Sequence, residues 1–110
     1  MSTASLTELA QQQIELALQA TSGRSAATVY GGHEHRLRQT VIALAAGQQL
    51  HEHENPGEAT VQVLLGRVRL VAGESSADGS AGDLLVVPDQ RHALEAVEDS
   101  AVLLTVAMQV

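Results

Sequence analysis

The sequence predicts an all-β domain, a sandwich or a barrel, preceded by one amphipathic helix. After residue 27, short runs rich in Val, Leu, Ile and Thr recur along the chain, and Gly, Pro, Asn and Asp separate them. This punctuation is typical of antiparallel sheets. Because no strand-like run alternates with a long helical run, a parallel α/β sheet is disfavoured. A length of 110 residues fits one domain. We therefore expect a helical segment over residues 1–24 and a β domain over residues 25–110.

Residues 5–20 carry the pattern of a helix. Ser5 can cap its first turn, and Glu8 stands three positions later, which is the spacing of a capping box. Gly23 supplies a stop. The apolar residues recur at helical spacing: Leu6, Leu9, Ala10, Ile14, Ala17 and Leu18. This stripe needs a surface to cover, so we expect the helix to pack on the β domain or on a dimer partner.

Six runs predict strands, and their neighbours predict turns. The runs span residues 35–45, 59–65, 67–72, 83–88, 91–97 and 101–109. The segment 73–82 contains only small and polar residues. We expect that segment to form a mobile hairpin loop.

The composition limits how the core is built. The chain has one Tyr, no Phe, no Trp and no Cys. Packing must rest on Val, Leu, Ile and Ala, which bury less area per residue than aromatic side chains do. We therefore expect a homodimer interface to add stability. Without Cys, disulfides and thiolate metal sites are excluded.

The charge excludes two classes of partner. The net charge is −7, with six Lys and Arg in total. Such a chain repels phosphate backbones and anionic lipid surfaces, so we expect neither nucleic acid nor membrane as a partner. The N-terminus has no basic region followed by an apolar run, so a cytoplasmic location is expected.

The histidines are the main candidates for chemistry. His51 and His53 form one His-x-His pair, and His33 and His35 form another. In a strand, alternate residues share one face, so each pair can present two imidazoles to one metal ion. For His33 and His35, a solvated strand end is the preferred interpretation.

Two segments together resemble the two motifs of the cupin superfamily. The first is Gly47-x3-His51-x-His53-x4-Glu58, and the second is Gly82-x5-Pro88-x3-His92. The resemblance covers residues 40–105. It implies a small double-stranded β-helix, that is, a jelly-roll or cupin barrel. It also implies that His51, His53, Glu58 and His92 hold a divalent transition metal inside the barrel, and such a ligand set suits Fe, Mn, Ni, Zn or Cu.

The motifs depart from the family pattern in ways that leave the ligand set open. Counted back from Gly66, the ligand position falls on Ala59 instead of Glu58. Because faces alternate along a strand, this one-residue difference decides whether Glu58 points inward. A bulge near Pro56 could restore it. A site of three histidines and a barrel without metal are the alternatives.

The resemblance suggests a function without naming a substrate. It implies a metal-dependent cupin that acts on a small molecule, with dioxygenase-like or isomerase-like chemistry. The alternative is a non-catalytic module that binds a small ligand or senses a metal. Gln62 and Tyr30 are candidate contacts for such a ligand. Whether the protein is an enzyme is left open at this stage.

Overall fold

A computed structural model describes residues 1–53 and 57–108, except for the side chains of residues 52 and 53. It contains one helix and nine strands within that part of the chain. They follow in the order α1 (Leu6–Gln19), β1 (Arg24–Tyr30), β2 (Leu37–Leu44), β3 (Gln49–His53), β4 (Gly57–Leu65), β5 (Arg67–Ala72), β6 (Ser75–Ser80), β7 (Leu84–Val86), β8 (His92–Ala96) and β9 (Ser100–Met108).

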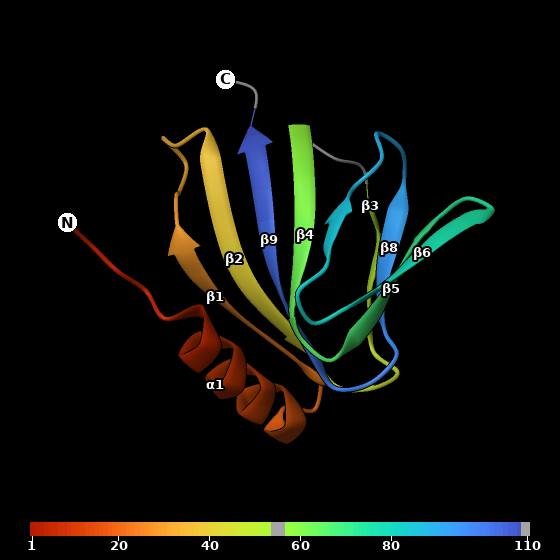
Figure 1. Ribbon diagram of the computed structural model, residues 1–110, viewed down its shortest axis with the longest axis horizontal. Coiled ribbons are helices and arrows are strands. Elements are labelled where there is room, and N and C mark those ends of the chain that lie inside the picture. Colours follow the sequence, from red (N-terminus) through yellow and green to blue (C-terminus); the bar gives the residue numbers. More distant parts are fainter. Residues whose placement is uncertain (54–56, 109–110) are drawn as a thin grey trace.

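The strands form two antiparallel sheets that face each other (Figure 1). One sheet has the order β1-β2-β9-β4-β7, and the other has the order β3-β8-β5-β6. Strands that are distant in the sequence are neighbours, as β2 and β9 are, so the chain crosses between the sheets several times. This is the arrangement of a jelly-roll barrel and confirms the fold class predicted from the sequence.

The space between the sheets holds the main core. Val61 and Val63 enter it from β4, Val102 from β9, and Val68 and Leu70 from β5. Along β4, buried and less buried residues alternate, as expected when one face of a strand meets the core. The packing therefore uses branched aliphatic side chains in place of aromatic ones.

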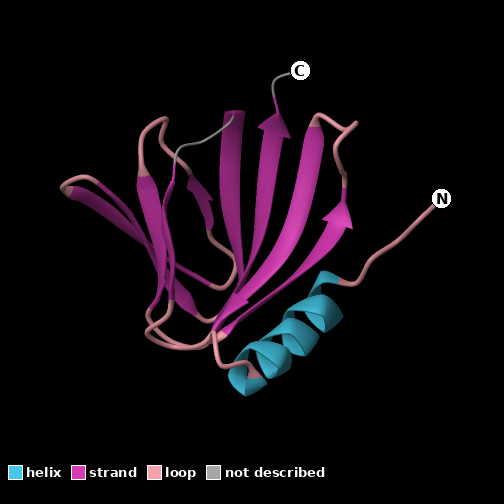
Figure 2. Cartoon of the chain, turned by 180° about the vertical axis from the view of Figure 1, so that it is seen from behind, coloured by secondary structure: helices cyan, strands magenta, loops and turns pink. Residues whose placement is uncertain are grey.

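The helix covers the outer face of the larger sheet (Figure 2). A second cluster joins Ala10 and Ala17 of α1 to Ala43 of β2 and Ala101 of β9. These small side chains let the helix backbone lie close to the sheet. Ser5 caps the helix by accepting a hydrogen bond from the Glu8 amide at 3.2 Å. Both the helix and its cap were predicted correctly.

Three strands, β1, β3 and β6, lie outside the six runs predicted from the sequence. Residues 24–30 form β1, which pairs with β2 although its Ser, Ala and Thr content has no strong apolar pattern. Within the segment 73–82, residues 75–80 form strand β6 and not a loop. Its partner β5 supplies the backbone hydrogen bonds, and Gly79 packs under Leu85 and Val63.

Two features of the structure bear on partners: the length of its helix and the exposed apolar residues of β7. In the part of the chain that the structure describes, no helix is both long and apolar enough to span a bilayer. Leu84 and Val86 on the edge strand β7 are 59% and 74% exposed. The homodimer expected from the composition stays a prediction, because the structure holds a single chain.

Candidate functional site

His92 is the one histidine that the described part of the chain buries. It begins β8, and its side chain is 5% exposed. Its Nδ1 lies 2.9 Å from the carbonyl oxygen of Gln90. Because a carbonyl oxygen can only accept, Nδ1 must carry the proton of this hydrogen bond. In the neutral ring the lone pair is then on Nε2, the tautomer in which an imidazole binds a metal or accepts a proton from a ligand.

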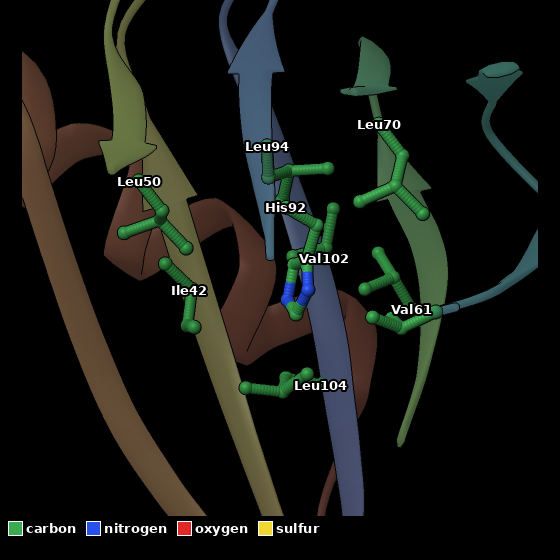
Figure 3. A pocket seen from close by; sticks show the side chains of 9 residues that line it. Ile42, Leu50, Val61, Leu70, His92, Leu94, Val102 and Leu104 are labelled. Carbon is green, nitrogen blue, oxygen red and sulfur yellow. The ribbon is translucent and has the colours of Figure 1, made fainter. Parts of the chain in front are cut away.

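The ring of His92 lies in an apolar pocket between the two sheets (Figure 3). Nine residues line this interior pocket: Ile42, Leu50, Val61, Leu70, Val87, His92, Leu94, Val102 and Leu104. His92 is the only titratable residue among them. The cavity volume is about 30 Å³, enough for one or two water molecules or an ion. The pocket therefore presents one oriented imidazole in an otherwise aliphatic setting.

His53 lies opposite His92 in the backbone ladder between β3 and β8. The pairing shifts between Leu50 and His53, so β3 carries one more residue than β8 over this stretch. Such a bulge interrupts the alternation of faces along the strand. The side chain of His53 lies outside the described residues, so its predicted role as a ligand is not tested.

His51 is placed on the outer side of the smaller sheet. It is exposed and lines an open groove with Gln49, Arg91 and Glu95. Leu50, its neighbour in the chain, lines the interior pocket instead. The structure therefore does not bring His51 and His92 into one pocket. The sequence argument assumed unbroken alternation between positions 51 and 53, and the bulge breaks that alternation.

Two further candidates on β4 also face outward. Glu58 is exposed, whereas Ala59 is 5% exposed and belongs to the core. Gln62 pairs with Leu103 and Leu84 on the outer face and does not line the interior pocket. Near Pro56 the backbone lies outside the described residues, but from Gly57 onward β4 follows the register that points Ala59 inward.

Tyr30 and His35 lie together outside the barrel core. Their rings meet edge to face, with centroids 5.3 Å apart. Tyr30 is 50% exposed, and His33 and His35 are exposed in the segment between β1 and β2. Both histidines are therefore exposed to solvent, as expected from the sequence.

Arg38 of β2 was not among the candidates taken from the sequence. Its Nε is shielded from solvent and has no hydrogen-bond partner. The sequence signal was weak: Arg38 alternates with apolar and Thr residues in a run that was treated only as a strand.

The described side chains do not complete a metal site by themselves. Among residues 1–51 and 57–108, no three His, Asp or Glu side chains gather closely enough to hold an ion. A metal centre at His92 would need ligands from outside this set.

Comparison with solved structures identifies the fold. A conserved protein of unknown function from Streptococcus pyogenes is 28% identical, with a TM-score of 0.73 over 83% of this chain and 79% of that one. An RmlC-like cupin from Desulfovibrio desulfuricans is 25% identical, with a TM-score of 0.72 over 97% and 96%.

Enzymes of the same fold are also similar. The salicylate 1,2-dioxygenase of Pseudoaminobacter salicylatoxidans, solved as a mutant, is 20% identical with a TM-score of 0.74, and the match covers 88% of this chain and 33% of that one. No protein-family model matches the chain, and no curated protein matches it significantly. The match to the RmlC-like cupin reaches across nearly the whole chain and agrees with the sheet topology. The chain therefore has the fold of small cupin-domain proteins.

Proposed function

We propose that this cupin binds a divalent transition metal at the interior pocket and acts there on a small molecule. The observation that carries the proposal is the orientation of His92: a buried ring whose Nδ1 donates to a backbone carbonyl. Histidines that ligate metals are usually held in this way, because the second hydrogen bond sets the tautomer and the direction of the ring. Fe, Mn, Ni, Zn and Cu all accept such an imidazole.

His53 is the proposed second ligand. The support for this assignment is the backbone pairing, in which His53 is the partner of His92. His51 joins them only if the irregular end of β3 turns its ring off the outer groove. Glu58 faces solvent and is not part of the proposed centre. When bound, the metal supplies Lewis acidity or oxygen activation, and His92 and the aliphatic lining orient the small molecule and keep bulk water out.

The kind of reaction follows less closely from the residues. The similarity to a salicylate dioxygenase, at 20% identity, indicates one chemistry that this fold supports, and cupins also carry many others. Within the interior pocket, His92 is the only side chain that can transfer a proton. We therefore propose dioxygenase-like chemistry on a small molecule, with the metal as the reactive centre.

A second candidate function is a metal-free module that binds a small ligand. The observation that favours it is the outward placement of His51 and Glu58, two of the four residues that the motifs imply as ligands. In this case Nε2 of the neutral His92 imidazole would accept a hydrogen bond from the ligand itself.

Metal analysis separates the two functions. We expect purified protein to contain about one equivalent of transition metal, and Ni²⁺ or Co²⁺ to bind the chelator-treated protein in a calorimetric titration. Loss of a hydrogen bond behind a ligand lowers metal affinity by about 10- to 100-fold, so His92→Ala and His53→Ala should each lower it further. His33→Ala, an exposed histidine, is the matched control and should bind as the unchanged protein does. If the purified protein neither contains nor binds metal, the metal centre is wrong and the metal-free ligand-binding function remains.

A further inference from the structure

We propose that the open end of the barrel above His92 binds a small organic monocarboxylate, and that the guanidinium of Arg38 holds its carboxylate group. The proposal names the substrate class of the site described above, so as a statement about substrate it rests on the proposed function. The binding itself depends only on the described residues.

The backbone register points Arg38 into the barrel. Arg38 is opposite Val106 of β9, and Val106 is opposite Ala59 of β4. Val106 and Ala59 both belong to the interior core. Since directly opposed residues share a face, Arg38 extends from the inner face of the sheet.

Arg38 and His92 belong to the same end of the barrel. Strands β2 and β8 both begin at the upper end in Figure 1. Thr40 lies opposite Leu104, which lines the interior pocket. Arg38 is two residues nearer the opening than Thr40, or about 7 Å along the strand. A ligand of a few carbon atoms can therefore reach from the guanidinium into the pocket beside the imidazole.

One of the donor groups of the Arg38 guanidinium has no hydrogen-bond acceptor among the described residues. Its Nε is shielded from solvent and has no hydrogen-bond partner. The stem of Arg38 passes close to Gly31, where an added Cβ would come within 3.2 Å of Arg38 Cγ. A shielded donor with no acceptor destabilises the folded protein, and an oxygen atom of a bound ligand would supply the missing acceptor.

Charge favours an anion with a single negative charge. At the inward-facing positions of the described strands, no Asp or Glu is available to neutralise Arg38. One guanidinium offers two parallel N–H groups that match the two oxygens of a carboxylate. A phosphate dianion would need a second cation. The protein as a whole carries −7, so unspecific attraction of anions to its surface is disfavoured.

The pocket restricts the rest of the ligand. Arg38 does not line the interior pocket, whose members are aliphatic apart from His92 and whose cavity volume is about 30 Å³. A short alkyl chain that reaches it meets apolar side chains, whereas a strongly polar substituent would lose hydration without gaining partners.

The test compares butyrate with butyramide, which has the same shape and no charge. Binding is followed by ¹⁵N NMR on chelator-treated and on Ni²⁺-loaded protein, with the Arg38 Nε–H signal as a direct reporter. A charged hydrogen bond contributes enough for about a tenfold to hundredfold preference, so we expect butyrate to bind at least about tenfold more tightly. Inorganic phosphate is titrated in parallel, and we expect it to bind more weakly than butyrate.

Matched variants assign the effect to Arg38. Arg38→Met keeps the stem and should abolish the preference for butyrate, whereas Arg38→Lys should retain part of it. Arg24→Met, an exposed arginine at the far end of β1, should change nothing. Because Arg38→Met removes the shielded donor, we also expect it to melt at a higher temperature than the unchanged protein, which verifies that it folds.

The outcomes keep the two proposals apart. Equal binding of butyrate and butyramide, tighter binding of phosphate, or full binding by Arg38→Met would overturn the carboxylate site. If Ni²⁺ binds and butyrate does not, only the carboxylate site fails. If butyrate binds through Arg38 and no metal binds, only the metal centre fails.

Discussion

His92 Nδ1 donates to the carbonyl oxygen of Gln90 across 2.9 Å, two residues before it in the chain. This bond is made within the turn that leads into β8, so the ring direction is set by local backbone and not by a distant side chain. It holds the imidazole toward Leu104 and Ile42 inside the barrel, as Figure 3 shows. The first prediction concerns this residue.

Metal should stabilise the folded protein through His92. A ligand that binds only the native state raises the free energy of unfolding by about 2.7 kcal/mol at a concentration 100 times its dissociation constant. We expect excess Ni²⁺ to raise the melting temperature of the unchanged protein and of His33→Ala by several degrees, and to leave His92→Ala unaffected. An equal shift in all three would mean that the ion binds elsewhere.

The Gln13–Ser25 pair should couple the helix to the sheet. The Ser25 hydroxyl of β1 donates to Oε1 of Gln13, a residue of α1 that is only 8% exposed. Ser25→Ala leaves that acceptor without its donor, and we expect it to lower the free energy of unfolding by about 1–3 kcal/mol in urea.

The double variant Gln13→Leu/Ser25→Ala is the control for this pair. It removes both polar groups, so it should recover part of the lost stability. If the stability losses of the single variants Ser25→Ala and Gln13→Leu add up to the loss in the double variant, the hydrogen bond between the two residues does not contribute to stability.

Gly66 should tolerate no side chain where the chain passes from one sheet to the other. Its φ is +83°, and an added Cβ would overlap the carbonyl oxygen of Asp99. We expect Gly66→Ala to destabilise the fold by about 3 kcal/mol or more.

Gly47 separates the two causes. Its φ is +86°, but an added Cβ there meets nothing within 4 Å. Gly47→Ala should therefore cost only the strain of a left-handed backbone, about 1 kcal/mol. If thermal unfolding gives the same loss for both variants, the contact with Asp99 is not what requires glycine at position 66.

The pKa of Asp78 should lie below the ordinary value for an aspartate. The cause is a hydrogen bond from Arg69 Nε at 2.8 Å, aided by the positive charges of Arg69 and Arg67. Since the folded pKa is lowered, the stabilising contribution is complete above the unfolded value, about 3.9. It is lost as the pH falls below that value through the folded pKa.

Carbon-detected NMR titration of the Asp78 carboxyl tests this directly. Arg69→Gln should move the titration of Asp78 upward, and Arg24→Gln should not. The effect on stability should be small, because both partners are substantially exposed. If Arg69→Gln leaves the pKa of Asp78 unchanged, the hydrogen bond from Arg69 is not the cause of the lowered pKa.

The sequence by itself determined most of the architecture. The capped helix at Ser5, the punctuated apolar runs and the two cupin-like motifs were local patterns, and each predicted its element because propensity and burial agreed there. The resemblance of the second motif also singled out His92, which the structure buries in the interior pocket, while its role as a ligand stays a prediction. Strand β6 escaped prediction because its backbone pairing with β5, and not its own side chains, makes it a strand.

Only the tertiary structure decided which side chains meet. One extra residue in β3 places His51 on the outer groove, and the register of β4 places Ala59 inward in preference to Glu58. That Arg38 faces the inside of the barrel follows only from the pairing of β2 with β9. The physical reason is the two-residue period of a strand: a shift of one position moves a side chain to the other face, and such shifts depend on partners that are distant in the sequence.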